Sequence, residues 1–483
     1  MIIKRHKYLI LTMLVISVSI GILFSYFVNT HDDYYIPFGI SAEGSVQFAA
    51  DIGNGRYLSN FLGNFLSQRG LLNDFIKAAI FFFIILLLAD NSVGLKLSSL
   101  IIASALLIYP SKGMFGSCYV WSHCYYNYVL PIFLWLASLS MLKRDKKLFL
   151  VPLITAAFLQ MLCSENTSII IFLAAAVIAC FNYKSAELCS RKTSLLYLAV
   201  SFIGLLIMFA LPKLMGVSEN VSFYRDSLLD NGIIALIKNA EKNIFYISCY
   251  LQEMCILYPA FLAFLLADAC INKKYKYFIA CFAAYIAVLI LEYGLNMSVY
   301  ESRWYIRILY SAVFMLFQLL LIISTIKIYS RDKKRLLIIY ILALLSQAEL
   351  LVVEPIGTRC LFITYILYSS ALIMLIDELL ENNNFLYKYI CALFSAVYVI
   401  CCAVMIPKMK SIYELDKLRL DLIRAQLAEG HTTINVINLP DDGLLWIPNG
   451  SYAWSSTFNL GDPDEMTFNF YPPEILDNIN NTD

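Results

Sequence analysis

Two adjacent carboxylates near the amino terminus, Asp32 and Asp33, are the first residues with an evident capacity for chemistry. They come just after an apolar run that ends at about residue 27. Carboxylates are unfavourable beside a membrane, and one in this place can serve as a general base or hold a divalent cation. The alternative is a solvated helix end that marks the membrane interface. No cofactor is predicted beyond that divalent cation, for which Asp32 and Asp33 are the only ligands considered.

A second group of candidates lies in residues 117–128, where the sequence reads SCYVWSHCYYNY. Aromatic faces combined with a few hydrogen-bonding groups are what a sugar or isoprenoid pocket needs. An aromatic belt at the membrane interface would explain the rings, but not a histidine and an asparagine among them. Both interpretations stay open. The binding candidates in this segment are Trp121, His123, Tyr126 and Asn127.

Charged side chains at the ends of apolar runs form a third group. Glu165 lies in a turn so short that it must be at the membrane surface, and later runs are bounded by Arg303, Arg307 and Arg359. A planar guanidinium matches phosphate oxygens, so these arginines are candidates for holding a lipid-linked phosphate. Snorkelling to lipid headgroups is the alternative, and it explains one such arginine more readily than three. Glu253 is the main charge deep inside a predicted span, where a structural and a functional role are equally open.

Residues 57–66 predict a helix that lies flat on the bilayer. Its apolar positions fall on one helical face, as expected for an interfacial helix. The alternative is a helix that only packs against its neighbours. Arg56 and Tyr57 directly precede this face and are further binding candidates. The residues of the apolar face are Leu58, Leu62, Phe65 and Leu66.

The composition shows which kind of molecule must position these residues. Of 483 residues, 60% are hydrophobic and 15% are charged, and the mean hydropathy is +0.71. Soluble domains are about a quarter charged, so the sequence excludes a soluble globular enzyme, a disordered chain and a secreted disulfide scaffold. The net charge of +1 gives no bulk attraction to nucleic acid. The 13 cysteines lie mostly in apolar runs without a CxxC pair, which argues against metal or redox chemistry. For Cys118 and Cys124, a disulfide bond and two free thiols are both open interpretations.

The apolar runs predict an all-α polytopic membrane protein. About 20 apolar residues cross a bilayer, and the chain offers about thirteen such runs, some of them short. The first follows Lys4, Arg5 and Lys7 and is too long for a signal-peptide core, so it is predicted to be an uncleaved anchor. The predicted spans are near 8–27, 74–89, 97–110, 128–142, 148–163, 167–182, 194–212, 244–267, 277–294, 308–326, 336–352, 360–377 and 389–406.

Basic residues set the predicted orientation, because lysine and arginine resist translocation. Counting spans puts five basic clusters, near residues 4–7, 143–147, 184–192, 273–276 and 331–335, on one side, which is therefore the cytoplasmic side. The amino terminus is then inside, and residues 1–406 form a membrane domain whose first outer loop is 28–73. Residues 407–483 form an extracytoplasmic tail, in which 415–427 predict a helix and 432–437 a strand, giving a small α/β unit.

The order of these features resembles the GT-C superfamily of polytopic glycosyltransferases, and most closely its uncharacterised bacterial members associated with surface polysaccharides. The likeness covers most of the chain through short motifs. The Trp-Trp-Asp type signature of oligosaccharyltransferases is absent, so protein asparagine is not the implied acceptor. The matching pieces are Asp32-Asp33, Gly55-Arg56-Tyr57, Trp121, Tyr126-Asn127-Tyr128, Pro131, Ser164-Glu165-Asn166, Pro355 and Arg359.

The resemblance implies an inverting membrane glycosyltransferase of the bacterial cytoplasmic membrane. Such an enzyme takes a sugar from a polyprenyl-phosphate donor on the outer face and passes it to a cell-surface glycan or lipid-linked acceptor. Asp33, with Asp32 as the less favoured candidate, would accept the proton of the acceptor hydroxyl. Arg303, Arg307 or Arg359 would neutralise the departing phosphate. No nucleotide or nucleic-acid partner is implied, and the sequence has no Gly-rich phosphate loop.

Three other functions stay open. A polysaccharide polymerase would share the membrane face and the arginines, but its largest outer loop is expected late in the chain. A transporter should show midplane ionisable residues and broken helices, for which Glu253 and 19 glycines give weak support. A purely structural membrane partner is the third.

Overall fold

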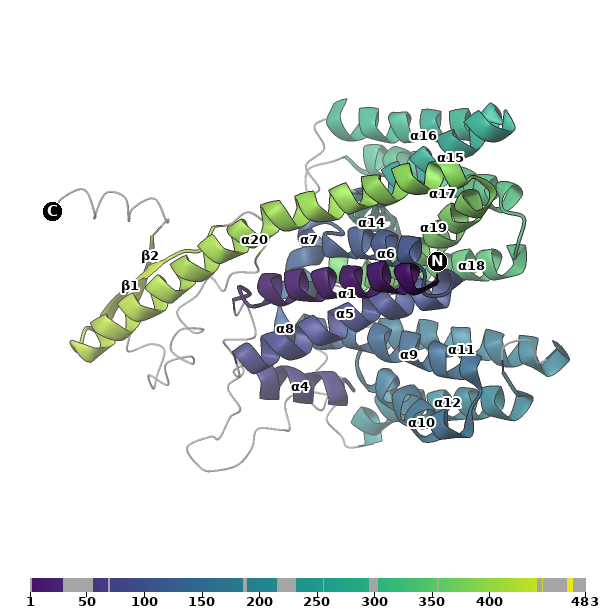
Figure 1. The fold of residues 1–483 in the computed structure, drawn as a ribbon. Helices are drawn as coiled ribbons and strands as arrows, with labels where there is room; N and C mark the ends of the chain where they lie inside the picture. Colours follow the sequence, from purple (N-terminus) through teal and green to yellow (C-terminus); the bar gives the residue numbers. More distant parts are fainter. Residues whose placement is uncertain are drawn as a thin grey trace.

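The computed structural model describes residues 2–28, 55–67, 70–185, 189–214, 232–254, 256–294, 303–353, 356–440, 445 and 467–471. Within these residues the chain is a bundle of α-helices with one small sheet at its carboxyl end (Figure 1). A hydrocarbon layer offers no hydrogen-bond partners to the backbone. Apolar runs therefore form helices, in which the backbone N–H and C=O groups bond to one another. The architecture is that of an all-α polytopic membrane protein.

Ten helical segments in the described part of the chain are long and apolar enough to cross a membrane. All ten coincide with predicted spans. The helices in these segments are α1 (Ile2–Phe24), α5 (Leu71–Val93), α9 (Leu130–Arg144), α11 (Glu165–Ser185), α12 (Arg191–Leu214), α16 (Tyr275–Gly294), α17 (Trp304–Ile328), α18 (Lys333–Glu349), α19 (Phe362–Asn382) and α20 (Asn384–Ala428).

The first of two bent helix pairs joins α6 (Leu97–Ile108) to the stretch 112–120 at an angle of 86°. Pro110 stands at this bend, and proline disfavours helical backbone in the residue before it. Ser111 then starts the short helix α7 (Lys112–Met114), because its hydroxyl accepts the Met114 amide at 3.1 Å.

The second bent pair replaces a span that the sequence predicts as straight. Helix α14 (Gly232–Gln252) meets α15 (Leu257–Asn272) at 66°, so the span predicted over 244–267 is bent in its middle. Glu253 therefore lies at a bend and not deep within a span. Counting each bent pair as one span raises the total in the described residues to twelve. The predicted span 148–163 corresponds to a shorter apolar helix, Lys147–Leu162, that contains α10 (Leu150–Leu159).

Helix α19 is the centre of the bundle. Of its membrane-spanning window, 94% is buried inside the protein, against 11% for α16. A helix that is apolar on every side and covered on every side belongs in the core, whereas α16 can face lipid. Helices α5, α6, α15 and α18 pack around α19.

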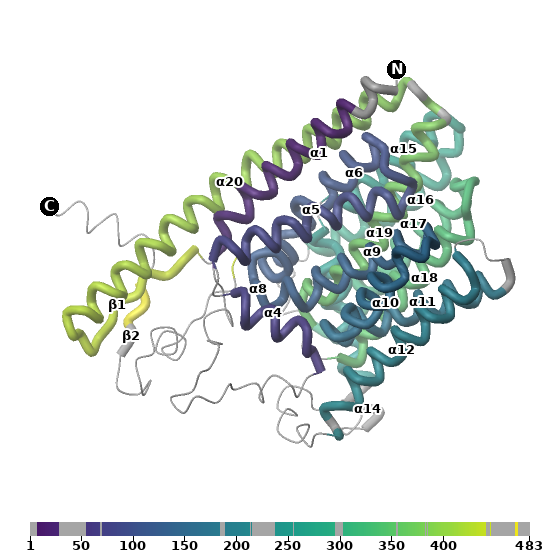
Figure 2. Tube along the Cα trace, turned by 60° about the horizontal axis from the view of Figure 1, so that its bottom comes forward, coloured from purple at the N-terminus to yellow at the C-terminus, as the bar shows by residue number. Residues whose placement is uncertain are grey.

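Helix α20 runs beside α1 and continues past the end of the bundle opposite the amino terminus (Figures 1 and 2). It is a single helix through Pro407, so the domain boundary predicted at 406/407 falls inside a continuous element. Its last turns include the predicted helix 415–427, and the predicted strand is β1 (Thr433–Ile437), which pairs in parallel with β2 (Thr467–Tyr471). Ile423 of α20 and Ile434 and Val436 of β1 form a small core there.

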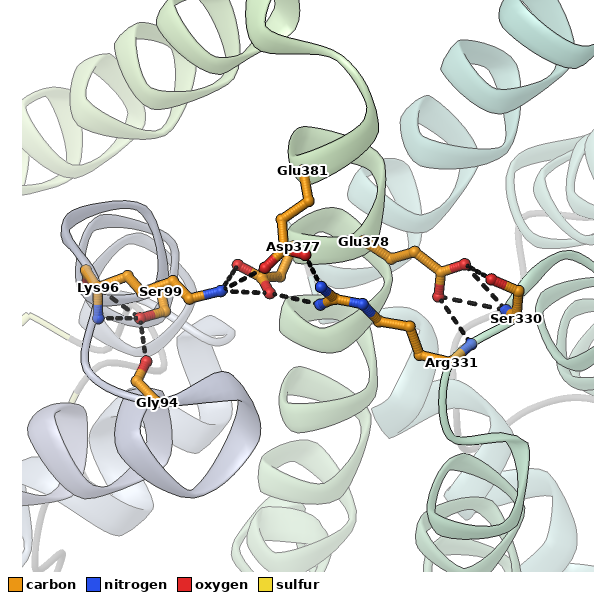
Figure 3. Close-up of polar contacts among 8 residues, drawn as sticks. All are labelled: Gly94, Lys96, Ser99, Ser330, Arg331, Asp377, Glu378 and Glu381. Atoms are coloured by element: carbon orange, nitrogen blue, oxygen red, sulfur yellow. Dashed lines mark hydrogen bonds and ion pairs between the residues drawn. The ribbon is translucent and has the colours of Figure 1, made fainter.

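Ion pairs hold the loops together at the end of the bundle where α1 begins. Figure 3 shows Asp377 of α19 between two cations from separate loops. Lys96 Nζ lies 2.8 Å from one Asp377 oxygen and 2.9 Å from the other, and Arg331 Nη1 is 3.2 Å away. The adjacent Glu378 accepts the Ser330 amide at 2.9 Å. Because Asp377 is only 4% exposed, these partners satisfy a charge that would otherwise be buried alone.

Candidate functional site

Helix α4 (Tyr57–Ser67) forms where the flat helix is predicted, and it is fixed to the segment after the first bent pair. The Ser59 hydroxyl is fully buried, 2.5 Å from Asn127 Oδ1 and 2.7 Å from the Cys163 carbonyl. Asn64 Oδ1 lies 2.8 Å from His123 Nε2. His123 and Asn127, predicted as binding residues, thus anchor α4.

Gly63 permits this close approach. A Cβ atom at this position would stand 2.7 Å from His123 Cδ2, closer than real carbon atoms pack. The absence of a side chain therefore lets α4 lie directly on the His123 ring. Phe61 and Phe65 stack on the outer side of α4, 5.9 Å apart, and are exposed there.

The segment that receives α4 is irregular. Two π-helical stretches, η1 (Phe115–Val120) and η2 (Tyr125–Val129), flank the short helix α8 (Ser122–Cys124). Such wide turns are rare, and they occur often at functional sites. Tyr126, predicted as a binding residue, donates its hydroxyl to Asn73 Oδ1 at 2.7 Å and so braces this segment against α5.

Arg56 and Glu165 form a buried ion pair beside α4. Arg56 Nε lies 2.9 Å from Glu165 Oε2, and the side chains are 23% and 6% exposed. Burial alone would lower the pKa of Arg56, but Glu165 together with Tyr128 and Cys124 raises that pKa above its ordinary value. The pair joins the first loop to the start of α11.

Arg359 approaches the same place from another loop. It lies in the short helix η7 (Thr358–Leu361), and its Cζ is 5.4 Å from the centre of the Trp121 ring. The Tyr128 hydroxyl lies 3.7 Å from Sγ of the neighbouring Cys360, and Arg359 and Arg56 are both within electrostatic reach of it. Two guanidinium groups that are 303 positions apart in sequence thus lie near one phenol.

Two further carboxylates border this cluster. Glu349, at the end of α18, is near enough to Glu165 for their charges to repel each other, and its Oε2 is buried with no hydrogen-bond partner among the described residues. Glu253 Oε2 lies 3.6 Å from the point where a Cβ of Gly113 would be, and Thr358 Oγ1 is 3.2 Å from that point. Glu253 therefore flanks η7, the element that carries Arg359.

We name the group Arg56, Trp121, Tyr128, Glu165 and Arg359 the arginine cluster. Sequence analysis singled out four of its members; it quoted Tyr128 only within a motif. It missed Glu349, although a lone acidic residue in the apolar run 336–352 was a usable signal.

Other predicted residues lie elsewhere. Arg307 forms a two-bond pair with Glu241, with both contacts at 3.0 Å. It lines a separate hollow between α14 and α17 that contains no member of the arginine cluster. Arg303 donates to the Tyr305 hydroxyl at 3.1 Å and is exposed. Tyr57 begins α4, and its buried hydroxyl has no hydrogen-bond partner among the described residues.

The predicted catalytic pair lies outside the described residues, since Asp32 and Asp33 belong to 29–54. Over the part of the chain that is described, no three histidine, cysteine or acidic side chains are grouped as metal ligands. Cys118 and Cys124 are both buried and are not joined by a disulfide bond.

The arrangement can hold an anion. Arginine presents five N–H donors in a rigid fork, and here two arginines lie near one phenol and an indole ring, with Arg56 oriented by the Glu165 carboxylate. Such a set suits a phosphate group next to a ring-stacking ligand. Comparison with known proteins adds no family: the chain matches no protein-family profile, no curated protein and no solved structure.

Proposed function

We propose that the protein is a membrane glycosyltransferase of the GT-C type, which moves a sugar from a polyprenyl-phosphate donor to a glycan or lipid-linked acceptor. In this proposal the chain crosses the bacterial cytoplasmic membrane thirteen times, through the ten long segments, the two bent pairs and Lys147–Leu162. The basic loops face the cytoplasm, and the arginine cluster and the carboxyl-terminal tail face outward.

The observation that carries the proposal is that Arg56, paired with Glu165, and Arg359, over the Trp121 ring, both lie near Tyr128. Snorkelling to headgroups would turn each arginine outward to lipid, each at its own helix end. Here one arginine is paired with a buried glutamate and the other is stacked on Trp121, so both are held against the protein. Two oriented guanidinium groups supply the positive charge that a leaving phosphate requires.

The reaction divides among three parts of the site. A carboxylate of the first loop, Asp33 before Asp32, accepts the proton of the acceptor hydroxyl as that oxygen bonds to the anomeric carbon of the sugar. The bond between that carbon and the phosphate oxygen breaks, and its electron pair leaves with the phosphate. Arg359 and Arg56 take up the resulting negative charge.

Described residues at both ends of the first loop support a place for Asp33 near this site. The loop is preceded by Phe27, whose ring lies 5.8 Å from that of Phe115 in η1. Later in the same loop come Gly55 and Arg56, and Arg56 belongs to the arginine cluster. The described residues on the two sides of 29–54 thus contact η1, which packs against η7, and the arginine cluster itself.

One observation favours a transporter as the second candidate. Transporter sites are built at interrupted helices, and this chain has two bent pairs, the second with Glu253 at the break. The two functions differ in their product. A transferase makes a new glycosidic bond, whereas a transporter changes only the side of the membrane on which its ligand is found.

Replacement of Arg359 by lysine tests the proposal. Lysine keeps the charge but loses the fork and the fit to Trp121, so transfer of labelled sugar from a polyprenyl-phosphate donor should fall about 10- to 100-fold, the equivalent of one or two charge-assisted hydrogen bonds. Arg303→Lys is the matched control, because Arg303 is an exposed arginine at another loop end, and its transfer rate should stay within about twofold. Equal rates in the two variants would contradict the phosphate role of Arg359.

A further inference from the structure

A second cavity lies at the other end of the bundle, and nothing in the proposed function uses it. It has a volume of about 460 Å³, is open on one side, and is lined by α5, α9, α11, α18 and α19. Its lining residue Phe181 is 16 positions after Glu165 on α11, which is about 24 Å along a helix. The cavity is therefore distinct from the arginine cluster.

The inner walls of this cavity are apolar. Side chains from five helices line it, among them Leu88, Trp135, Ala174, Ile339 and Leu367. A volume of this size is within the range of pockets that hold small ligands, and walls that are mostly apolar favour a hydrocarbon chain.

The mouth of the cavity is cationic. Lys143, Lys334 and Arg335 line it, and Asp332 is the one carboxylate among the lining residues. The Asp332 side chain is already used, since it accepts the Arg335 backbone amide at 3.1 Å. The lining thus has a net charge of +2 where hydrocarbon walls meet the end of the bundle.

Two of these cations converge on one backbone oxygen. Lys143 Nζ donates to the Asn91 carbonyl at 2.9 Å, and Arg335 Nη2 donates to the same carbonyl. The Lys143 ammonium has three N–H donors and makes two hydrogen bonds to the described residues. The Arg335 guanidinium has five N–H donors and makes one. Adjacent like charges with unused donors favour an anion, and phosphate fits this geometry.

We propose that this cavity binds an anionic glycerophospholipid such as phosphatidylglycerol. The phosphate lies between Lys143 and Arg335, and one acyl chain enters the apolar interior. Basic pockets between transmembrane helices recognise anionic lipid headgroups in this way. The occupant comes from the surrounding leaflet, so the site does not depend on the proposed transfer reaction.

Lipid binding to the purified full-length protein in a neutral detergent tests this proposal. The probes are dioctanoyl phosphatidylglycerol, dioctanoyl phosphatidylcholine and glycerol 3-phosphate, and native mass spectrometry counts bound molecules across a concentration series. The protein should bind one molecule of phosphatidylglycerol, and it should bind this lipid at least tenfold more tightly than either other probe. Equal binding of phosphatidylcholine would overturn the charge argument, and equal binding of glycerol phosphate would overturn the role of the apolar walls.

Two kinds of variant then locate the binding. The double variant Lys143→Gln/Arg335→Gln should weaken phosphatidylglycerol binding tenfold or more, while the control Lys147→Gln/Lys333→Gln, which removes two exposed cations of the same end, should change it less than twofold. Ala174→Phe fills the cavity without changing charge and should also abolish binding. Undiminished binding in either cavity variant would refute the site, and because the two variants perturb different groups, misfolding of one leaves the other decisive.

Discussion

The pair between Arg56 and Glu165 should be worth about 2–3 kcal/mol to the folded protein. Glu165→Gln keeps the shape of the side chain and removes its charge 2.9 Å from Arg56 Nε. Breaking a buried ion pair costs about 3–5 kcal/mol, because one charge is left alone. Arg56 is 23% exposed and an amide still accepts one hydrogen bond, so the expected loss lies at or just below the lower limit of that range.

A double-mutant cycle isolates this interaction. Glu165→Gln, Arg56→Gln and the double variant are unfolded in mixed micelles by titration with dodecyl sulfate, and the free energies of unfolding are compared. The double variant should be more stable than the sum of the single losses by about 1–3 kcal/mol. The exposed pair Arg424–Asp421, at 3.1 Å, serves as the control and should show a coupling below about 0.5 kcal/mol. Additive losses at Arg56 and Glu165 would refute the pair as the link between the first loop and α11.

Two further predictions concern α4 and the orientation of the chain. Gly63→Ala should destabilise the protein by about 1–3 kcal/mol and reduce sugar transfer, because the new Cβ would collide with His123. Gly21→Ala should be tolerated, because its Cβ meets nothing within 4 Å. Equal stability of the two variants in the same unfolding titration would refute the close packing of α4. A cysteine introduced at the exposed Glu429, at the end of α20, should react with a membrane-impermeant maleimide in intact cells more than the parent chain does, and labelling only after lysis would reverse the assignment of the two faces.

Much of the site was predictable because charged side chains in apolar surroundings stand out. Arg56, Glu165 and Arg359 were selected from separate loops, and the counting of spans placed those loops on one face. The structure brings all three together with Trp121. Alternation of charge along the chain carries this information, because each loop must lie at one end of the bundle or the other.

The exact pairings were not predictable. Arg307 looked equivalent to Arg359 as a loop-end arginine, but Glu241, 66 positions earlier, neutralises it. His123 and Asn127 looked like ligand-binding groups, yet their partners are Asn64 and Ser59 of α4. The pairing of polar side chains depends on how the helices pack against one another, and a hydropathy profile contains no information about that packing.

The bends escaped prediction for a related reason. Hydropathy sums over a window and has no direction, so a run of apolar residues reads the same whether it is straight or broken near Glu253. Glu349 was overlooked because one acidic residue changes the mean of a long apolar run very little. Both glutamates mark places where the chain departs from a simple span, and both border the arginine cluster.

The most direct measurement of the central claim is sugar transfer by the wild-type protein and by Asp33→Asn, with Asp32→Asn beside them. Membranes with matched amounts of each protein receive a labelled polyprenyl-phosphate sugar, and the product is a new glycoside. If Asp33 is the base, its amide removes the proton acceptor and keeps its shape, so transfer should fall by roughly 10²–10⁴-fold, while Asp32→Asn has a milder effect. No transfer by the wild-type protein, or undiminished transfer by both amide variants, would contradict the account.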